Sequence, residues 1–251
     1  MILTRRNMLA GLVVGAGGLV SGCDAVVRST PGKEVLFRGE DFHRALQRSL
    51  MNRDALAREF DAADMSPRFR TNGNTDPGTP DYAAHVANRF ADWRLVVDGM
   101  VARPSRFSLA DLQAMPQRAQ ITRHDCVEGW SAIGKWQGPR LATILNSVGL
   151  SSNARYLVFH CADSSGGVPY YESIDLYDAF HPQTILAWAM NDARLTVGHG
   201  APVRLRVERM LGYKHAKFVM RIEAVESFAA IGKGKGGFWE DRSGYEWYAG
   251  I

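Results

Sequence analysis

The chain has 251 residues, of which 46% are hydrophobic and 22% charged, a composition typical of a globular protein with one sizeable domain and a full core. The formal net charge of +4 is mild, and no helix or arm carries a dense run of Lys and Arg, so nothing indicates nucleic-acid binding. Three cysteines, Cys23, Cys126 and Cys161, are too few and odd in number for a disulfide framework.

The first residues indicate an export signal. Arg5 and Arg6 stand just before an apolar, Gly-rich run over residues 8–20, which is too short to span a bilayer comfortably. Twin arginines in this position are typical of the Tat export route, which carries folded proteins. We therefore expect the Tat machinery to export the chain to the periplasm, with residues 1–22 as its signal peptide.

The signal region ends in Val20-Ser21-Gly22-Cys23, which resembles a bacterial lipobox. Lipidation would make Cys23 the first mature residue and would anchor the protein to a membrane by acyl chains. Asp24, directly after it, would favour the inner membrane, by resemblance to proteobacterial lipoproteins. The alternatives are a plain cleavable signal and an uncleaved anchor with an incidental cysteine.

Residues 23–65 are expected to form a linker followed by one amphipathic helix. The segment Asp24–Gly32 has the composition of a linker, and apolar residues recur at helical spacing between Asp41 and Phe60. The next segment, Ser66–Pro80, contains three prolines and the sequence Asn-Gly-Asn, so we expect loops there.

From Trp93 onward the pattern changes to short strands. The pair Asp98-Gly99 is a hairpin-turn signal, and Ser108 has the position of an N-cap for a helix through Met115. The further expected elements are a strand over residues 120–127, a helix over 139–148 closed by Gly149, and strands over 155–161, 184–190 and 217–225, with a turn at Asn191-Asp192.

Residues 202–208 alternate cleanly, with apolar side chains on one face and Arg204 and Arg206 among the polar ones on the other. Strands with short interspersed helices predict a strand-rich α+β fold. The main domain is expected over residues 66–228. A Gly- and aromatic-rich tail over residues 229–251 either walls a pocket mouth or packs on the domain surface.

Cys126 lies near the end of the predicted strand over residues 120–127 and has His124, Asp125 and Glu128 as close neighbours. A thiolate ligates soft or high-valent metals, and nearby cations lower the pKa of a thiol toward that state. A buried structural cysteine is the alternative, since free cysteine is among the most buried residue types. A cysteine hydrolase using Cys126 and His124 lacks an evident orienting group.

A second polar segment runs from His199 to Lys217. Gly200 and Ala201 precede a proline, and small residues allow close backbone approach to a flat ligand. Five basic side chains between positions 204 and 217 face a single acid, which favours a phosphate-bearing ligand. The alternative is a solvated basic strand face.

The blocks HDCVEGWS (residues 124–131) and GHGAPVRLRVER…GYKHAK (residues 198–217) together resemble the molybdopterin-binding domain of the sulfite oxidase superfamily. The closer resemblance is to its bacterial branch, which includes the catalytic subunits of periplasmic protein-methionine-sulfoxide reductases. It covers roughly residues 66–228. It implies molybdenum-molybdopterin as the cofactor.

By that resemblance, Cys126 supplies the thiolate to molybdenum, and Tyr170 and Glu128 are the other implied catalytic residues. Tyr171 competes with Tyr170 for this position. Cys161 is expected to line the cofactor pocket rather than to react. The residues implied to hold the pterin and its phosphate are Asn72, Cys126, Cys161, His199, Arg204, Lys214, His215, Ala216 and Lys217.

Sulfite oxidases carry sulfite-binding arginines where this chain has Thr71 and, soon after Cys126, Glu128–Ser131. Their loss argues against sulfite on charge grounds. Trp130 and Tyr170 are expected to offer an apolar wall and one hydroxyl. We therefore expect an oxygen-atom-transfer enzyme that reduces uncharged S- or N-oxides, with electrons from a separate membrane b-type or soluble c-type cytochrome. The alternatives are a sulfite-oxidising dehydrogenase and a cofactor-less binding lipoprotein.

Overall fold

The structure is a computed structural model that describes residues 29–251. The chain divides into two units, residues 1–52 and residues 53–251. The twin arginines and Cys23 lie outside the described residues, so the structure does not test the expected export and lipidation. Among the described residues, no helix combines the length and the apolar character needed to cross a membrane.

The described part of the first unit is one helix, α2 (Thr30–Leu50). We expected a linker up to Gly32 and a helix from Asp41 to Phe60, and both boundaries are wrong. Residues 53–60 belong to the second unit and are not helical. The N–H of Phe60 donates to the carbonyl of Ile121 at 2.9 Å, which holds this segment extended.

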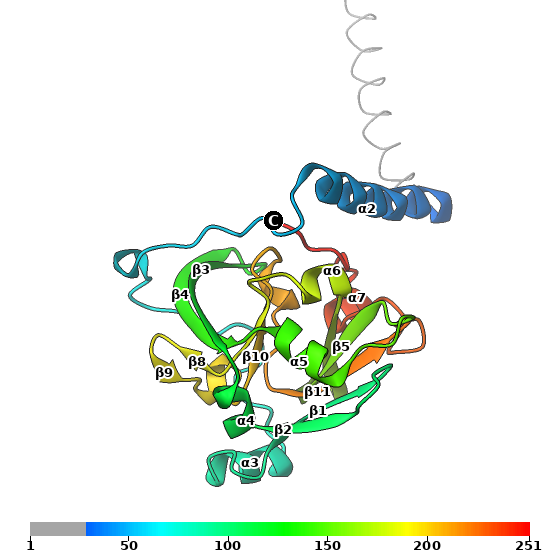
Figure 1. The fold of residues 1–251 in the computed structure, drawn as a ribbon. Coiled ribbons are helices and arrows are strands. Elements are labelled where there is room, and N and C mark those ends of the chain that lie inside the picture. Colours follow the sequence, from blue (N-terminus) through cyan, green and yellow to red (C-terminus); the bar gives the residue numbers. More distant parts are fainter. Residues whose placement is uncertain (1–28) are drawn as a thin grey trace, which may run out of the picture. The chain divides into compact units, whose positions relative to one another are not determined.

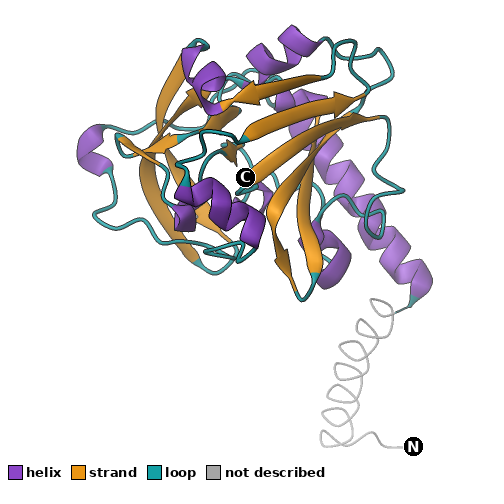
Figure 2. Cartoon of the chain, turned by 90° about the horizontal axis from the view of Figure 1, so that it is seen from below, coloured by secondary structure: helices purple, strands orange, loops and turns teal. Residues whose placement is uncertain are grey.

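Two larger sheets and a short strand pair form the second unit (Figures 1 and 2). The first sheet contains, in spatial order, β2 (Ser105–Ser108), β1 (Arg94–Gly99), β11 (Val219–Val225), β5 (Tyr156–Ser165) and β6 (Val168–Asp175). The second contains β3 (Gln117–Cys126), β4 (Trp130–Pro139), β8 (Ala189–Met190) and β9 (Ala193–Arg194). The pair is β10 (Arg204–Arg206) with β7 (Ile185–Ala187).

Short helices are interspersed among these strands, as expected for the α+β, strand-rich class. They are α3 (Pro80–Ala87), α4 (Leu109–Ala114), α5 (Leu141–Val148), α6 (Leu176–Ala179) and α7 (Phe238–Ser243), with 3-10 turns η1 (Ala62–Asp64), η2 (Val197–His199) and η3 (Gly212–Lys214). Only the β1–β11 pair is parallel among the paired strands of the described residues.

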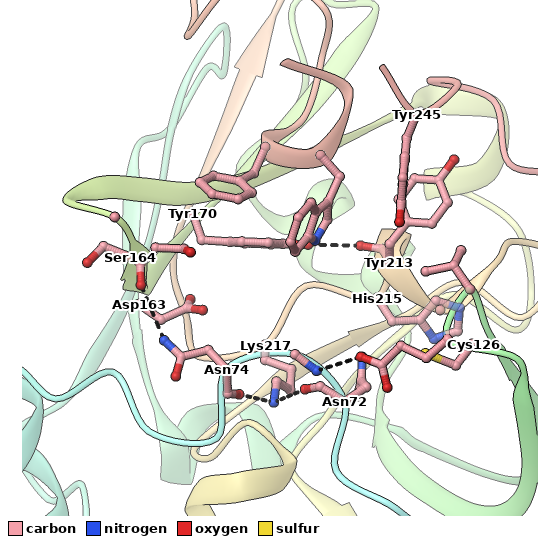
Figure 3. Close-up of a pocket in the computed structure, with 18 residues that line it drawn as sticks. Asn72, Asn74, Cys126, Asp163, Ser164, Tyr170, Tyr213, His215, Lys217 and Tyr245 are labelled. Atoms are coloured by element: carbon pink, nitrogen blue, oxygen red, sulfur yellow. Dashed lines mark hydrogen bonds between the residues drawn. The ribbon is translucent and has the colours of Figure 1, made fainter. Parts of the chain in front are cut away.

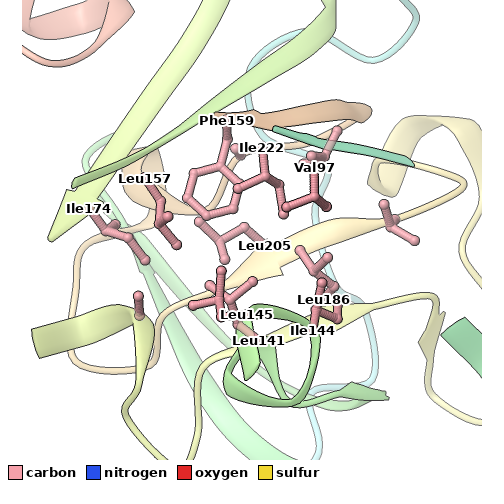
Figure 4. Close-up of a cluster of buried hydrophobic side chains, with 14 of the residues drawn as sticks. Val97, Leu141, Ile144, Leu145, Leu157, Phe159, Ile174, Leu186, Leu205 and Ile222 are labelled. Atoms are coloured by element: carbon pink, nitrogen blue, oxygen red, sulfur yellow. The ribbon is translucent and has the colours of Figure 1, made fainter. Parts of the chain in front are cut away.

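The main core lies between the five-stranded sheet, α5 and the β7–β10 pair (Figure 4). Leu141, Ile144, Leu145 and Val148 of α5 are almost fully buried, at the i, i+3, i+4, i+7 spacing of an amphipathic helix. They meet apolar side chains of the sheet, among them Phe159. Each such side chain stabilises the fold by roughly 1.5–3 kcal/mol relative to its exposed state.

Several local predictions are confirmed. Ser108 caps α4 and accepts a hydrogen bond from the N–H of Asp111, and Gly149 ends α5 with φ of 68°. Asn191 and Asp192 both have positive φ, 50° and 63°, and connect β8 to β9 in a tight turn.

Other local predictions are wrong. Asp98 and Gly99 do not form a hairpin turn: they pair with Glu223 and Ala224 of β11, and the chain reverses toward β2 only after them. Pro80, expected in a loop, is the first residue of α3, where its missing N–H costs nothing. Pro139 belongs to β4 rather than to the helix that follows.

The polar face of residues 202–208 is buried, so the solvated-strand alternative is wrong. Arg204 and Arg206 are 0% exposed, like Leu205 between them. One face of β10 points into the apolar core. The other faces Trp136 of β4, over whose ring both guanidinium groups lie. A strand buried on both faces, with two cations on one of them, requires partners for those charges.

Candidate active site

A pocket of about 590 Å³ opens beside the end of β3, next to the loop of residues 72–74 and the β5–β6 hairpin (Figure 3). Segments far apart in sequence meet there. The expected site residues that line it are Asn72, Cys126, Glu128, Tyr170, His215 and Lys217. The expected residues that do not line it are Cys161, His199, Arg204, Lys214 and Ala216.

Cys126 is the last residue of β3, directly before a tight turn in which Gly129 has φ of 83°. The turn points the backbone amides of Val127 and Glu128 at the sulfur. Burial raises the pKa of the Cys126 thiol, and these two amides and the charge of Arg204 act in the opposite direction. The surroundings therefore favour a thiolate only when a further cation joins them.

Glu128 bridges the Cys126 turn to the loop of residues 72–74. Its carboxylate accepts a hydrogen bond from the indole N–H of Trp130 at 3.0 Å and a longer one from the N–H of Gly73 at 3.5 Å. Trp130 does not line the pocket, contrary to our expectation of an indole wall. Its ring instead packs against Phe69 and His124 behind the turn.

The two buried arginines of β10 differ in how well they are paired. Arg206 donates to both carboxylate oxygens of Glu208, at 2.9 and 2.6 Å, and to Nδ1 of His124 at 3.0 Å. Arg204 donates only one bond, from Nη2 to Oδ1 of Asn72 at 3.1 Å, while its Nε and Nη1 are buried without a hydrogen-bond partner. Burial, and secondarily Arg206, lowers the pKa of Arg204 to about 9.

Lys217 fixes the loop that carries Asn72. Its ammonium donates to the carbonyls of Asn72 at 2.7 Å, Gly198 at 3.0 Å and Asn74. Burial, followed by the charge of Arg204, lowers the pKa of Lys217 to about 7. Its three donor hydrogens are thus occupied by backbone, and the two cations, Lys217 and Arg204, hold Asn72 from both its carbonyl and its side chain.

Two buried histidines lie beside these cations. His215 donates from Nε2 to the carbonyl of Met210, 3.1 Å away, and its Nδ1 has no hydrogen-bond partner. Burial and the nearby arginines hold the pKa values of His215 and His124 well below the usual range, so both rings are neutral. His124 bonds to Arg206 rather than to an orienting carboxylate, which does not fit the nucleophile–base pair of a hydrolase.

Three other expected residues, Cys161, His199 and Ala216, lie outside the lining of the pocket. Cys161 is on β5, where burial raises the pKa of its thiol well above the usual range. His199 is in η2, with Nδ1 2.8 Å from the hydroxyl of Thr196 and Nε2 3.4 Å from the carbonyl of Phe69. Ala216 is buried and its carbonyl accepts from the N–H of Leu205 at 2.8 Å.

Lys214 is engaged elsewhere. Its ammonium lies 2.5 Å from Glu172 of β6 and 2.7 Å from Glu240 of α7, and all three side chains are at most 1% exposed. Burial acts to lower the pKa of Lys214, but the two carboxylates raise it above its usual value. This triad ties the C-terminal segment to the five-stranded sheet.

The C-terminal segment walls the pocket, one of the two outcomes that the sequence left open. Phe238, Trp239 and Tyr245 all line it. Phe238 stacks on Tyr170 with ring centroids 5.3 Å apart. Of the two adjacent tyrosines, Tyr170 is therefore the one that lines the pocket. The hydroxyl of Tyr171 donates to Asp241 at 2.6 Å, and Tyr171 does not line the pocket.

Sequence reasoning missed five polar or aromatic lining residues, Asn74, Asp163, Ser164, Ser165 and Tyr213. Asp163 had a usable signal: it follows the apolar strand that contains Cys161, just before a Ser-Ser-Gly-Gly turn. Tyr213 sits inside the GYKHAK block, between residues that were singled out for their charge.

The chain belongs to the family described as oxidoreductase molybdopterin binding domain, whose model matches residues 83–229. It is thus a molybdopterin-binding oxidoreductase with the sulfite-oxidase-like fold. The chain is 34% identical, over 98% of its length and 87% of the relative's, to a putative protein-methionine-sulfoxide reductase subunit YedZ1 of Azospira oryzae.

A second relative is the protein-methionine-sulfoxide reductase catalytic subunit MsrP of Ralstonia nicotianae, 36% identical over 53% of this chain and 44% of that protein. Among solved structures, the sulfane dehydrogenase SoxCD of Paracoccus pantotrophus matches 55% of this chain and 39% of its own, with a TM-score of 0.50 and 22% identity. That likeness supports the fold alone.

Replacing Lys214 by Met is expected to destabilise the cofactor-free protein by about 3–5 kcal/mol, because two carboxylates would remain buried without their cation. Urea denaturation measures this free energy of unfolding. The control is Lys135→Met, whose ion pair with Asp192 is partly exposed and is worth about 1 kcal/mol at most. Equal stability of the two variants would contradict the structural role of Lys214.

Proposed function

We propose that this protein reduces uncharged S- or N-oxides at a molybdenum atom held by molybdopterin and ligated by Cys126. Family membership establishes the oxidoreductase class and the molybdopterin. The metal, the direction of the reaction and the individual residue roles are our proposal. The names of the two curated relatives, both associated with methionine sulfoxide reduction, favour the same direction.

The residues present fit such a cofactor. Arg204 keeps two nitrogen donors, Nε and Nη1, buried without an acceptor, and an unmade hydrogen bond of a buried charged group costs more than that of a neutral one. A phosphate is the ligand whose oxygens best match a guanidinium. In the proposed complex, Arg204, Asn72, His199 and the segment 215–217 hold the cofactor, with Cys161 behind them.

The donor set fits a metal that arrives with an organic cofactor. Among residues 29–251, no three His, Cys, Asp or Glu side chains are placed together to hold a metal ion by themselves. The pocket instead offers one soft donor, the sulfur of Cys126. A single thiolate suits a metal whose other ligands come from molybdopterin.

Molybdopterin, when bound, supplies a molybdenum centre that transfers an oxygen atom together with two electrons. Cys126 binds the metal as a thiolate, and its neighbouring amides stabilise that charge. Tyr170 stays protonated, because burial and then Glu172 hold its pKa well above the usual range. Its hydroxyl, which donates to the carbonyl of Tyr213 at 3.1 Å, can turn to an oxygen in the pocket. Glu128 keeps the Cys126 turn in place.

The proposed direction of the reaction, reduction rather than oxidation, rests on the charge of the pocket. Lys217 is the one Lys or Arg that lines it, and its donors are taken by three backbone carbonyls. Arg123 pairs with Asp125 at 3.0 Å, and neither Arg123 nor Arg70 lines the pocket. In this proposal the cofactor phosphate takes the unsatisfied donors of Arg204. A sulfite dianion would therefore meet Glu128 and Asp163 without a free cation, which disfavours the sulfite-oxidising alternative.

The proposal includes the cellular setting expected from the sequence. The Tat machinery exports the folded protein to the periplasm, and a lipid on Cys23 anchors it to the inner membrane. A separate cytochrome, membrane b-type or soluble c-type, supplies the electrons. The twin arginines at positions 5 and 6 and the lipobox-like end of the signal support this setting.

Cys126→Ser is expected to lower molybdenum content and reductase activity by more than about a hundredfold. Loss of a residue that only hydrogen-bonds to a metal ligand already lowers metal affinity or activity about 10–100-fold. The fold should persist, because Cys126 is only partly buried. Metal analysis and a dye-linked assay on the purified variant, with thermal unfolding as the control for folding, test this. A serine variant with full turnover would remove Cys126 from the metal site.

A paired assay tests the direction. One arm offers sulfite with an oxidised dye, and the other offers methionine sulfoxide or trimethylamine N-oxide with a reduced dye. Turnover is expected only in the reductive arm, because the pocket lacks a free cation for a dianion. Efficient sulfite oxidation with a micromolar KM, a value ordinary for a native substrate, would reverse the proposed direction.

Replacing both Arg5 and Arg6 by Lys is expected to leave the protein in the cytoplasm, and Cys23→Ser to release it from membranes without blocking export. Cell fractionation followed by immunodetection measures both effects. Labelled palmitate incorporated by the wild type but not by Cys23→Ser would support lipidation of Cys23. If the wild type incorporates no palmitate, the proposed lipidation is wrong and only the proposed export remains.

A further inference from the structure

Five aromatic side chains line the pocket together, and the function proposed above uses only one of them. They are Tyr170, Tyr213, Phe238, Trp239 and Tyr245, and we call this set the aromatic wall. Its rings form a continuous series that starts with the stacked pair of Tyr170 and Phe238. The ring centroid of Trp239 lies 5.2 Å from that of Phe238 and 5.9 Å from that of Tyr245. The ring centroids of Tyr245 and Tyr213 lie 5.1 Å apart.

Two rings of the aromatic wall remain accessible. Phe238 is 1% exposed, whereas Trp239 and Tyr245 are partly exposed and line the pocket. The helix that carries Trp239 is fixed by the buried ion pair between Glu240 and Lys214, at 2.7 Å. A molecule that enters the pocket therefore meets apolar ring surface that is already held in place.

The aromatic wall adjoins the groups proposed to act on the substrate. The hydroxyl of Tyr170 donates to the carbonyl of Tyr213 at 3.1 Å. Tyr213 follows Gly212, where an added β-carbon would lie 3.1 Å from the carbonyl oxygen of Asp125, the residue before Cys126. A substrate whose oxygen meets the Tyr170 hydroxyl therefore has the aromatic wall beside it.

The polar residues of the pocket lie on another side. Figure 3 shows Tyr213 and Tyr245 in its upper part and Asn72, Asn74 and Lys217 in its lower part. Lys217 holds the loop of residues 72–74 on this lower side. The proposed cofactor contacts thus belong to the polar side, which leaves the aromatic side for the substrate.

Membership of the family does not assign the C-terminal part of the aromatic wall. The family model matches residues 83–229, and Phe238, Trp239 and Tyr245 follow that region. Their role has to be inferred from where they lie and from what aromatic rings bind.

We propose that the aromatic wall binds the substituent carried by the sulfur of the substrate, and that Trp239 and Tyr245 make the enzyme prefer S-oxides with a flat, apolar substituent such as a phenyl group. This inference rests on the proposed function. An aromatic substituent can stack on these rings or meet their edges, and both arrangements are favourable.

The chemistry of the proposed reaction agrees with this position. Reduction of a sulfoxide breaks the S–O bond, consumes two protons and two electrons from the proposed cytochrome, and releases water. Both carbon substituents stay on the sulfur. The oxygen must face the metal and the hydroxyl of Tyr170, so a substituent points to the neighbouring surface, which is the aromatic wall.

The test compares two sulfoxides that differ by one group, methyl phenyl sulfoxide and dimethyl sulfoxide, in a reduced-dye assay on cofactor-loaded protein. The readout is the ratio of their kcat/KM values, from which the fraction of loaded enzyme cancels. The wild type is expected to prefer the phenyl compound by at least about tenfold, because one apolar contact in a pocket changes discrimination about 10–200-fold. Trp239→Ala and Tyr245→Ala should each lower this ratio about tenfold.

Two further variants separate binding of the substituent from a general effect on folding. Trp239→Phe keeps an aromatic ring and should retain most of the preference. Tyr248→Ala removes a partly buried tyrosine of the same segment that does not line the pocket, and should keep the wild-type ratio.

A binding measurement gives a readout that does not depend on turnover. Methyl phenyl sulfide, the product, is titrated into the loaded protein and followed by NMR. Its Kd is expected to rise about tenfold in Trp239→Ala and to stay near the wild-type value in Trp239→Phe and Tyr248→Ala.

A wild type without preference for the phenyl compound would overturn the inference, as would Trp239→Ala and Tyr245→Ala variants with the wild-type ratio and the wild-type Kd. A loaded wild type that reduces neither sulfoxide would overturn the proposed function instead. Binding of the sulfide would then still decide whether the aromatic wall holds a phenyl group.

Discussion

The burial of two guanidinium groups against the ring of Trp136 is the constraint around which the second unit is organised. The charge of Arg206 is paired within the protein, by both carboxylate oxygens of Glu208. The charge of Arg204 is not: its one hydrogen bond, to Asn72, leaves two donor atoms unsatisfied in a fully buried position. A buried cation with incomplete pairing costs several kcal/mol, so a fold that retains it gains most by binding an anion there. In the proposed complex, the phosphate of molybdopterin supplies that anion.

Two further buried cations bring distant segments to the same pocket. Lys217 holds the loop of residues 72–74 through three carbonyls. Lys214 holds α7 through Glu240, and α7 carries the aromatic wall with Phe238 and Trp239. Each cation therefore orders a segment that local sequence alone would leave as a loop or a tail. The pocket forms where these segments and the end of β3 meet.

Local signals predicted part of the local structure and little of the long-range pairing. The cap at Ser108, the turn at Asn191-Asp192 and the strand that ends at Cys126 depend on neighbouring residues, and all are present. Lys214 and Lys217 looked alike in sequence, since one block contains both, yet their partners lie 19 to 145 residues away. The sequence could not distinguish the roles of the two lysines.

The sequence could not assign a role to Asp163 either, because burial and the absence of a partner are properties of the assembled pocket. The resemblance to molybdopterin enzymes identified six residues that line the pocket. It did not predict the hydrogen bond between Arg204 and Asn72.

Anomalous scattering from a crystal of the cofactor-loaded protein, recorded on both sides of the molybdenum absorption edge, tests most directly whether Cys126 binds the metal. One strong peak is expected in the pocket, at bonding distance from the sulfur of Cys126, with density for a phosphate against the free N–H groups of Arg204. A loaded protein whose molybdenum peak lies away from Cys126, or whose Arg204 faces no anion, would contradict this description of the site.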